Sequence, residues 1–283
     1  MQLVKFLDGP GSQPSIGLLD GDSVRPLRGS RRLSTFLHAA DPAAEVHRRL
    51  DPAADPLPLH AAMLLPPIDD QEVWAAGVTY IRSKQARQAE SETGGSFYDL
   101  VYSADRPELF FKATASRVVG PGDVIRVRSD TSWSVPEPEL ALVIDDTLRL
   151  VGLTIGNDVS ARDIEGRNPL YLPQAKVYDA SCALGPAVTL LSAVPDPANL
   201  TIALEILRDG SPAFQGETSS SRLARRLDEL ISWLGRDQVF PDGVILMTGT
   251  GIVPPDEFTL QPGDVVRIAI AGLGVLENVV APR

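Results

Sequence analysis

The stretch that decides how this 283-residue sequence is interpreted is Val135–Ile144, which reads VPEPELALVI. Its apolar second half predicts a buried strand, and alternate side chains of a strand share a face, so Glu137 and Glu139 point the same way. Two carboxylates on one face repel each other unless a cation lies between them. Oxygen ligands without His or Cys nearby suit a hard divalent ion, Mg²⁺, Mn²⁺ or Ca²⁺. The alternative is a solvated strand end at a sheet edge, because Pro138 has no N–H to donate to a ladder.

A third carboxylate follows the next apolar run. Asp158 lies in Gly156–Asp163 (GNDVSARD), directly after Val151–Ile155, and therefore at a predicted strand-to-helix junction. Such junctions are common sites for ligands, although an aspartate there can equally be an ordinary helix-start residue. Arg162, one turn into that helix, either holds a carboxylate substrate or pairs with a neighbouring acid.

Lysine is scarce, because only 4 Lys accompany 22 Arg. Lys112 and Lys176 stand in apolar company, which indicates a need for a compact donor or a tunable pKa. Otherwise their stems cover apolar surface while their ammonium groups reach water. A further candidate is Thr250 in Met247–Gly251 (MTGTG), whose hydroxyl and open backbone N–H groups could receive an anion. Gly-Thr-Gly also makes ordinary turns, so this motif is weak alone.

The order of β runs and helices predicts an α+β protein. Residues 1–66 are expected to form a small β-rich domain with a Pro-rich connector, and residues 67–283 a second domain. In the second domain many short β runs follow one another with few helices and without regular βαβ alternation, which favours a mixed, curled sheet. Val73–Val78 is predicted as one of its buried strands, and residues 80–92 as a polar helix.

Charge and composition exclude several classes of function. The formal net charge is −11, and all of it falls in residues 67–283. Acidic composition disfavours a nucleic-acid binder or a protein of anionic membrane surfaces, and no apolar run approaches the ~20 residues of a membrane span. One Cys excludes a disulfide framework and a thiolate zinc site. Met1–Lys5 does not begin a signal peptide, so a cytoplasmic protein is expected.

Taken together and in this order, these segments resemble the fumarylacetoacetate hydrolase family. The matching pieces are Trp74–Tyr80, Phe111–Lys112, Pro121–Asp123, Glu137–Glu139, Gly156–Asp163, Lys176, Gly185–Pro186 and Gly249–Thr250. The resemblance implies a mixed β-sandwich or β-roll with a small N-terminal β-rich domain, assembled as a homodimer or homotetramer. It also implies that Glu137, Glu139 and Asp158 hold Mg²⁺, or else Mn²⁺ or Ca²⁺. Lys176 would then polarise a 2-oxo acid substrate, and Thr250 would bind its carboxylate.

One departure from the family pattern separates its branches. Hydrolases and decarboxylases of the family pair a Glu with a His just after the strand that ends at Tyr80, whereas all three His of this chain lie in the first 60 residues. The branch that dispenses with this His comprises the 2-keto-3-deoxy sugar-acid dehydratases, such as 2-keto-3-deoxy-D-arabinonate dehydratase. The chain resembles that branch in Arg106–Thr114, Ser134–Leu140, Asp163–Tyr178 and Thr248–Pro254.

This branch implies metal-assisted enolisation and β-elimination of water, which would convert a 2-keto-3-deoxy pentonate to 2,5-dioxopentanoate in sugar-acid catabolism. Besides Lys176, the candidate catalytic residues are Glu108 and Glu90, because the second domain offers no imidazole. The candidate substrate-binding residues are Thr250, Arg162, Lys112, Ser83 and Arg87. Two alternatives stay open: an acylpyruvate hydrolase or oxaloacetate decarboxylase of the same family, and a non-catalytic 2-oxo acid binding protein.

Overall fold

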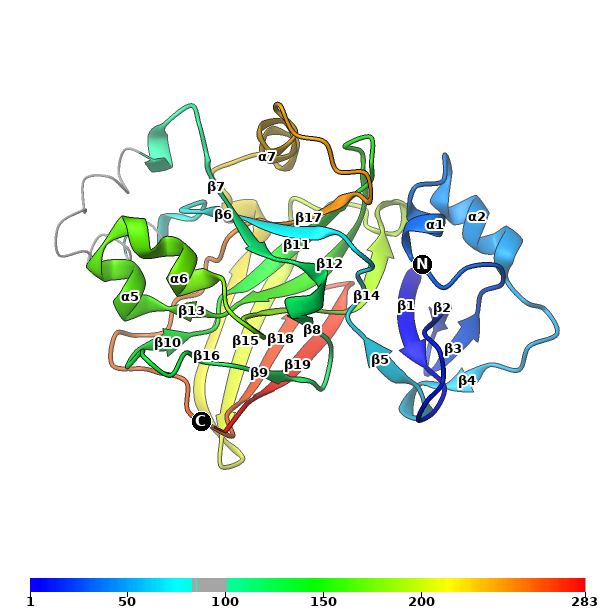
Figure 1. Ribbon diagram of the computed structural model, residues 1–283, viewed down its shortest axis with the longest axis horizontal. Helices are drawn as coiled ribbons and strands as arrows, with labels where there is room; N and C mark the ends of the chain where they lie inside the picture. Colours follow the sequence, from blue (N-terminus) through cyan, green and yellow to red (C-terminus); the bar gives the residue numbers. More distant parts are fainter. Residues whose placement is uncertain (83–84, 86–100, 283) are drawn as a thin grey trace.

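The computed structural model describes residues 1–82, 85 and 101–282 (Figure 1). In this part of the chain twelve strands form one mixed sheet in the order β4-β3-β2-β1-β14-β12-β11-β17-β6-β7, with β5 beside β1 and β8 beside β14. These strands are β1 Gln2–Leu7, β2 Ser15–Asp20, β3 Ser23–Pro26, β4 Leu57–Pro58, β5 Met63–Leu65, β6 Glu72–Gly77, β7 Glu108–Ala113, β8 Val118–Val119, β11 Pro138–Ile144, β12 Leu150–Asp158, β14 Cys182–Leu190 and β17 Val244–Met247.

A second sheet and a few short helices complete the described structure. The second sheet has the order β16-β15-β18-β19-β9, and β10 pairs separately with β13. The bounds are β9 Val124–Ile125, β10 Ser134–Val135, β13 Ser160–Ala161, β15 Thr201–Arg208, β16 Ser211–Ser219, β18 Val265–Ile270 and β19 Gly274–Val280, with helices α1 Ser34–Leu37, α2 Pro42–Arg49, α5 Arg162–Arg167, α6 Leu172–Lys176 and α7 Leu227–Leu234. Numerous strands in mixed sheets with few helices confirm the predicted α+β class. None of the described helices is long and apolar enough to span a membrane.

The largest core lies between the two sheets. Leu140 and Leu142 of β11 belong to one cluster of buried side chains with residues of β15 and β18. Ala141 and Val143, which alternate with them, belong to another cluster on the opposite face of the large sheet. A strand buried on both faces is apolar throughout, which explains the LALVI run of the sequence. By the same alternation Glu139 lies on the face that points away from the second sheet.

The N-terminal strands continue the large sheet. β1 pairs antiparallel with β14, with Gln2 opposite Thr189 and Leu3 opposite Val188, so the sheet crosses the domain boundary predicted at residue 66. Figure 1 shows β1–β5, α1 and α2 gathered on one side of the molecule. The division into two domains stays a prediction, and the two parts share one ladder of backbone hydrogen bonds.

A buried carboxylate holds the turn between β11 and β12. Asp145 is 1% exposed and accepts hydrogen bonds from the backbone N–H groups of Thr147 and Arg149 (both 2.9 Å) and from Nε of Arg149 (2.8 Å). Burial by itself would raise the pKa of Asp145, but these donors favour the charged form and hold the pKa below its usual value of 3.8. The turn fixes the register in which β11 and β12 bring their acidic residues together.

The substitution Asp145→Asn should lower the free energy of unfolding at neutral pH by about 2 kcal/mol, because it removes charge-assisted hydrogen bonds. A carboxyl group with a depressed folded-state pKa contributes stability above its unfolded pKa, and this contribution is lost as the pH falls through the folded-state pKa. Urea titrations should therefore show the difference between parent and variant shrinking below pH 3.8. The exposed Asp256→Asn is the control. A deficit of Asp145→Asn that persists unchanged in acid would contradict this account.

Candidate active site

Three carboxylates meet inside the large sheet. Glu137 immediately precedes β11, Glu139 is the second residue of β11, and Asp158 ends β12. They are 4%, 1% and 0% exposed, and their oxygen atoms lie within 4.8 Å of one another. β11 has β12 on one side and β17 on the other, so the alternative of a solvated strand end at a sheet edge is excluded. The paired carboxylates expected from the spacing of two are therefore joined by the third, although their role as metal ligands stays a prediction.

Lys176 lies directly against this cluster. Its Nζ donates hydrogen bonds to Glu137 Oε2 (2.8 Å), Asp158 Oδ2 (2.9 Å) and Ser160 Oγ (2.6 Å). The side chain is buried, so the alternative of an ammonium group that reaches water does not apply. Ser160 was not among the candidates from the sequence. The signal that would have found it is its spacing of two from Asp158, which puts both side chains on one face of an extended segment.

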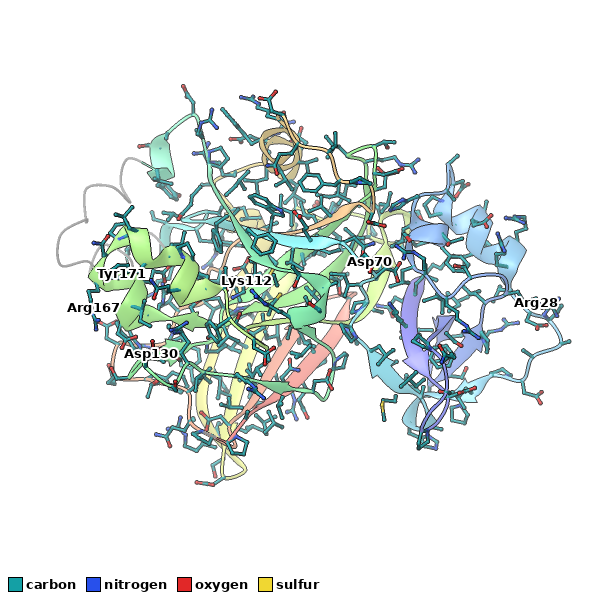
Figure 2. All side chains as sticks on the ribbon, in the orientation of Figure 1. Arg28, Asp70, Lys112, Asp130, Arg167 and Tyr171 are labelled. Atoms are coloured by element: carbon teal, nitrogen blue, oxygen red, sulfur yellow. The ribbon has the colours of Figure 1, made fainter. Side chains whose placement is uncertain are left out.

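Lys112 is buried on the other side of Asp158. Its Nζ forms an ion pair with Asp158 Oδ1 and donates to the backbone carbonyls of Val159 (3.2 Å) and Lys176 (2.6 Å). An ammonium group has three N–H donors, and the protein provides three acceptors. In Figure 2 the side chain points from β7 into the interior. Its predicted contact with substrate stays a prediction. The observed contacts hold the carboxylate of Asp158 and the backbone of Lys176 in place.

The contact between Lys112 and Asp158 shows how strongly the sheet curls. Lys112 belongs to β7 and Asp158 to β12, and the strands β11, β17 and β6 separate them along the sheet. Neighbouring strands lie about 4.8 Å apart, so a flat sheet would hold these two strands about 19 Å from each other. Direct ion pairing therefore requires the sheet to close around the site, and the mixed, curled sheet expected from the sequence supplies that shape.

Glu139 has no ion-pair partner among the residues that the structure describes. Its Oε2 accepts one hydrogen bond from the Gly249 N–H at 2.5 Å. Complete burial raises the pKa of Glu139 well above its usual value of 4.5, and the neighbouring Asp158 and Glu137 charges raise it further. A fully buried carboxylate beside two others is the environment that a hard divalent cation relieves, and the donor set therefore fits Mg²⁺, Mn²⁺ or Ca²⁺.

Arg162 contacts neighbouring acids, which is one of the two alternatives left open by the sequence. Its Nη1 lies 3.5 Å from Glu137 Oε1 and 3.3 Å from Glu165 Oε2, and all three side chains are buried. Its predicted role in substrate binding stays a prediction. The described buried charges of this region are four carboxylates and three cations: Glu137, Glu139, Asp158 and Glu165 against Lys112, Lys176 and Arg162. A divalent ion would change that balance from one negative to one positive charge.

The loop after β17 brings Thr250 close to Glu139. Gly249 has φ of +90°, and a Cβ at this position would lie 2.9 Å from the Ala76 carbonyl oxygen, so both conformation and space require glycine. The Thr250 hydroxyl is buried and exchanges hydrogen bonds of 3.2 Å with the backbone of Ile252. The predicted contact between Thr250 and a substrate carboxylate stays a prediction.

Glu108, the first residue of β7, lies opposite Gly77 of β6 and is partly buried. It shares a face of β7 with Phe110, which is two residues further along the regular part of the strand. The other candidates on this side of the site, Ser83, Arg87 and Glu90, fall outside the described residues, as does most of the helix predicted for residues 80–92.

The part of the chain that carries the site matches a known protein family. Residues 73–281, which contain all of the site residues described above, match the family described as fumarylacetoacetate (FAA) hydrolase C-terminal. The chain belongs to the fumarylacetoacetate hydrolase family. The resemblance identified from the sequence motifs is therefore confirmed.

Within the fumarylacetoacetate hydrolase family, the chain is similar to sugar-acid dehydratases. It is 51% identical over 212 residues to a probable 2-keto-3-deoxyxylonate dehydratase of Haloferax volcanii, covering 75% of this chain and 73% of the relative. It is 44% identical over 220 residues to 2-dehydro-3-deoxy-D-arabinonate dehydratase of Saccharolobus solfataricus, covering 77% and 74%. A solved structure of 2-keto-3-deoxy-D-arabinonate dehydratase, complexed with magnesium and 2,5-dioxopentanoate, matches with a TM-score of 0.85 and 35% identity over 100% of this chain and 99% of that chain. The predicted fold type and branch are both confirmed.

Replacing Glu139 of the carboxylate cluster should raise the Tm when metal is absent and abolish the rise in Tm that Mg²⁺ causes. A carboxyl with a raised folded-state pKa loses stabilising free energy as the pH rises above its unfolded value, here 4.5. Glu139→Gln removes this loss, so in EDTA at neutral pH we expect the variant to have a higher Tm than the parent. Added Mg²⁺ should raise the Tm of the parent and leave that of the variant nearly unchanged.

Differential scanning calorimetry of both proteins, with EDTA and with excess Mg²⁺, tests this prediction. Glu257→Gln, at an exposed position, should behave like the parent in both conditions. Equal stabilisation of the parent and Glu139→Gln by Mg²⁺ would exclude Glu139 as a ligand.

Proposed function

We propose that this protein is a metal-dependent dehydratase of a 2-keto-3-deoxy pentonate, such as 2-keto-3-deoxy-D-arabinonate, with 2,5-dioxopentanoate as the product. The observation that carries the proposal is the buried cluster of Glu137, Glu139 and Asp158 with Lys176 hydrogen-bonded to it. The 51% and 44% identity to two dehydratases of such substrates supports it.

Glu137, Glu139 and Asp158 would hold the metal ion. Mg²⁺ is the first candidate because a structure of the dehydratase at 35% identity contains magnesium, and Mn²⁺ or Ca²⁺ share its preference for oxygen ligands. When bound, the cation would act as a Lewis acid toward the substrate's carboxylate and 2-oxo oxygens and so lower the pKa of the C3 proton.

The charges around the cluster favour an anionic 2-oxo acid. With a divalent ion present, the described buried groups would carry one positive charge in excess, which a single carboxylate compensates. Lys176 is hydrogen-bonded to two carboxylates of the cluster, Glu137 and Asp158, and its ammonium group would stabilise the negative charge that develops on the 2-oxo oxygen as C3 loses its proton. Thr250 and the backbone of its loop would receive the substrate carboxylate.

Dehydration requires a base for the C3 proton and an acid for the departing C4 hydroxyl. No histidine occurs after residue 60, so we assign carboxylates to both functions. Glu108 is proposed for one of them because it shares its face of β7 with Phe110, whose ring centroid lies 5.7 Å from Lys176 Nζ. Glu90 is proposed for the other. The C3–H and C4–O bonds break and water leaves. Tautomerisation, in which one C5 proton moves to C3 and the 5-hydroxyl proton moves to C4, then gives the 5-aldehyde.

The hydrolase and decarboxylase alternatives are less consistent with this chain. The family members with those activities pair a His with a Glu, while the described imidazoles lie in the N-terminal part, where His38 is 3.5 Å from Asp146. A non-catalytic 2-oxo acid binding protein would have no use for candidate proton donors beside the cluster. It would be stabilised by 2-oxo acids without converting them.

The purified protein should convert 2-keto-3-deoxy-D-arabinonate to 2,5-dioxopentanoate when Mg²⁺ is present. Removal of metal with EDTA should abolish turnover, and Mg²⁺ should restore it. NMR of the product mixture distinguishes the alternatives. Pyruvate with an aldehyde would indicate aldol cleavage, and acetate or CO₂ from acylpyruvates or oxaloacetate would indicate a hydrolase or decarboxylase. Full activity without metal would contradict the metal-dependent mechanism.

Glu108→Gln should lower kcat by about 10²–10⁴-fold, the usual contribution of a general acid or base. The rise in Tm on addition of Mg²⁺ should persist, because Glu108 is not one of the proposed ligands. Steady-state kinetics and calorimetry on the same samples separate the two effects, with Glu257→Gln as the matched control. Unchanged kcat in Glu108→Gln would remove this residue from the mechanism.

A further inference from the structure

The Glu108 carboxylate occupies the space that a side chain at position 77 would need. In the β6–β7 ladder Gly77 lies directly opposite Glu108. A Cβ built on Gly77 would lie 2.0 Å from Oε2, 2.6 Å from Cδ and 3.2 Å from Cγ of Glu108. The glutamate therefore extends across β6, over the bare backbone of the glycine, and any larger residue at 77 would displace its carboxyl group.

The backbone at Gly77 gives no other reason for glycine. Its φ lies outside the left-handed region, in contrast to Gly249 with φ of +90°. A residue in an ordinary strand conformation is usually better served by a β-branched or other larger side chain, and glycine weakens a strand interior. The missing side chain is explained by the need for space.

The face of β7 that carries Glu108 is also the face that contacts the active site. Glu108 and Phe110 alternate along the regular part of β7 and so share one face, whereas the β6–β7 ladder has a register shift opposite Lys112. Lys112 Nζ forms an ion pair with Asp158, and the Phe110 ring centroid lies 5.7 Å from Lys176 Nζ. Because two residues of a strand span about 7 Å, Glu108 lies one such step from Phe110 along this face.

We propose that Gly77 is a positioning residue of the dehydratase: its lack of a side chain lets the Glu108 carboxylate extend across β6 to the position where it exchanges a proton with the substrate. This inference rests on the proposed function, and specifically on Glu108 as its acid or base. A carboxylate that lies against the backbone of a neighbouring strand has fewer positions available than one in open solvent, which matters because a misplacement of ~1 Å can cost about 10² in rate.

The test is the smallest possible addition, Gly77→Ala. The atoms that the methyl group would meet belong to the end of a flexible side chain, so the fold should accommodate it while the carboxylate moves. We expect kcat to fall at least tenfold, with KM and the Mg²⁺-dependent rise in Tm unchanged within error. Gly9→Ala, where a Cβ has nothing within 4 Å, is the control and should retain full kcat.

A double-mutant cycle identifies Glu108 as the residue through which Gly77 acts. In the Glu108→Gln background, Gly77→Ala should cause no further loss of kcat, because the affected group has already lost its function. A further loss as large as that seen in the parent would overturn the proposal. So would full kcat of Gly77→Ala when Glu108→Gln is inactive, and this outcome leaves the proposed dehydratase intact. Full kcat of Glu108→Gln would instead remove the acid or base assignment, and with it this inference.

Stability provides a second readout that is independent of activity. If Gly77→Ala lowers the Tm, the double variant Gly77→Ala with Glu108→Ala should recover the Tm of Glu108→Ala alone, because the methyl group then occupies the vacated space. A double variant as unstable as the sum of the two single changes would show that the methyl group collides with something other than Glu108, which overturns the proposal.

Discussion

The ion pair between Lys112 and Asp158 is the contact on which the arrangement of the site depends. Both side chains are fully buried, and a buried charge is tolerated only when it is paired and hydrogen-bonded. This pair joins β7 to β12 across three intervening strands, so its formation and the closure of the sheet require each other. The same Nζ binds the Lys176 carbonyl and thereby fixes the end of the helix that carries the second buried lysine.

The remaining charges follow from this closure. Once Asp158 is fixed between two lysines, Glu137 is held by Lys176 and Arg162, whereas Glu139 has a single backbone donor among the residues that the structure describes. The cluster is thus short of positive charge at one carboxylate. In the proposed function a divalent ion would supply that charge and leave an excess that one substrate carboxylate could neutralise, so metal binding and affinity for an anionic 2-oxo acid would be linked by the same electrostatic balance.

Local sequence patterns allowed much of the site to be predicted. The contacts that were not predicted are those between strands that lie far apart in the sequence. The spacing of two between Glu137 and Glu139, and the place of Asp158 after an apolar run, are local features, and the structure brings the three together. The partners of Lys112 lie 46 or more residues away along the chain, and a residue pattern does not reveal which distant strand curls back onto it. The pairing of β1 with β14 across the expected domain boundary was missed for the same reason.

Two glycines show which structural reasons can be recognised in a sequence and which depend on a distant residue. At Gly249 the positive φ and the nearby Ala76 carbonyl both demand glycine, and a Gly-rich strand end is recognisable in a sequence. At Gly77 the backbone is ordinary, and the reason for glycine is the side chain of a residue on the neighbouring strand. In the proposed mechanism a carboxylate takes the place of the imidazole that the chain lacks after residue 60. Glu108, placed by β7 and given room by the missing side chain of Gly77 on β6, would then be one way in which the shared scaffold performs elimination instead of hydrolysis.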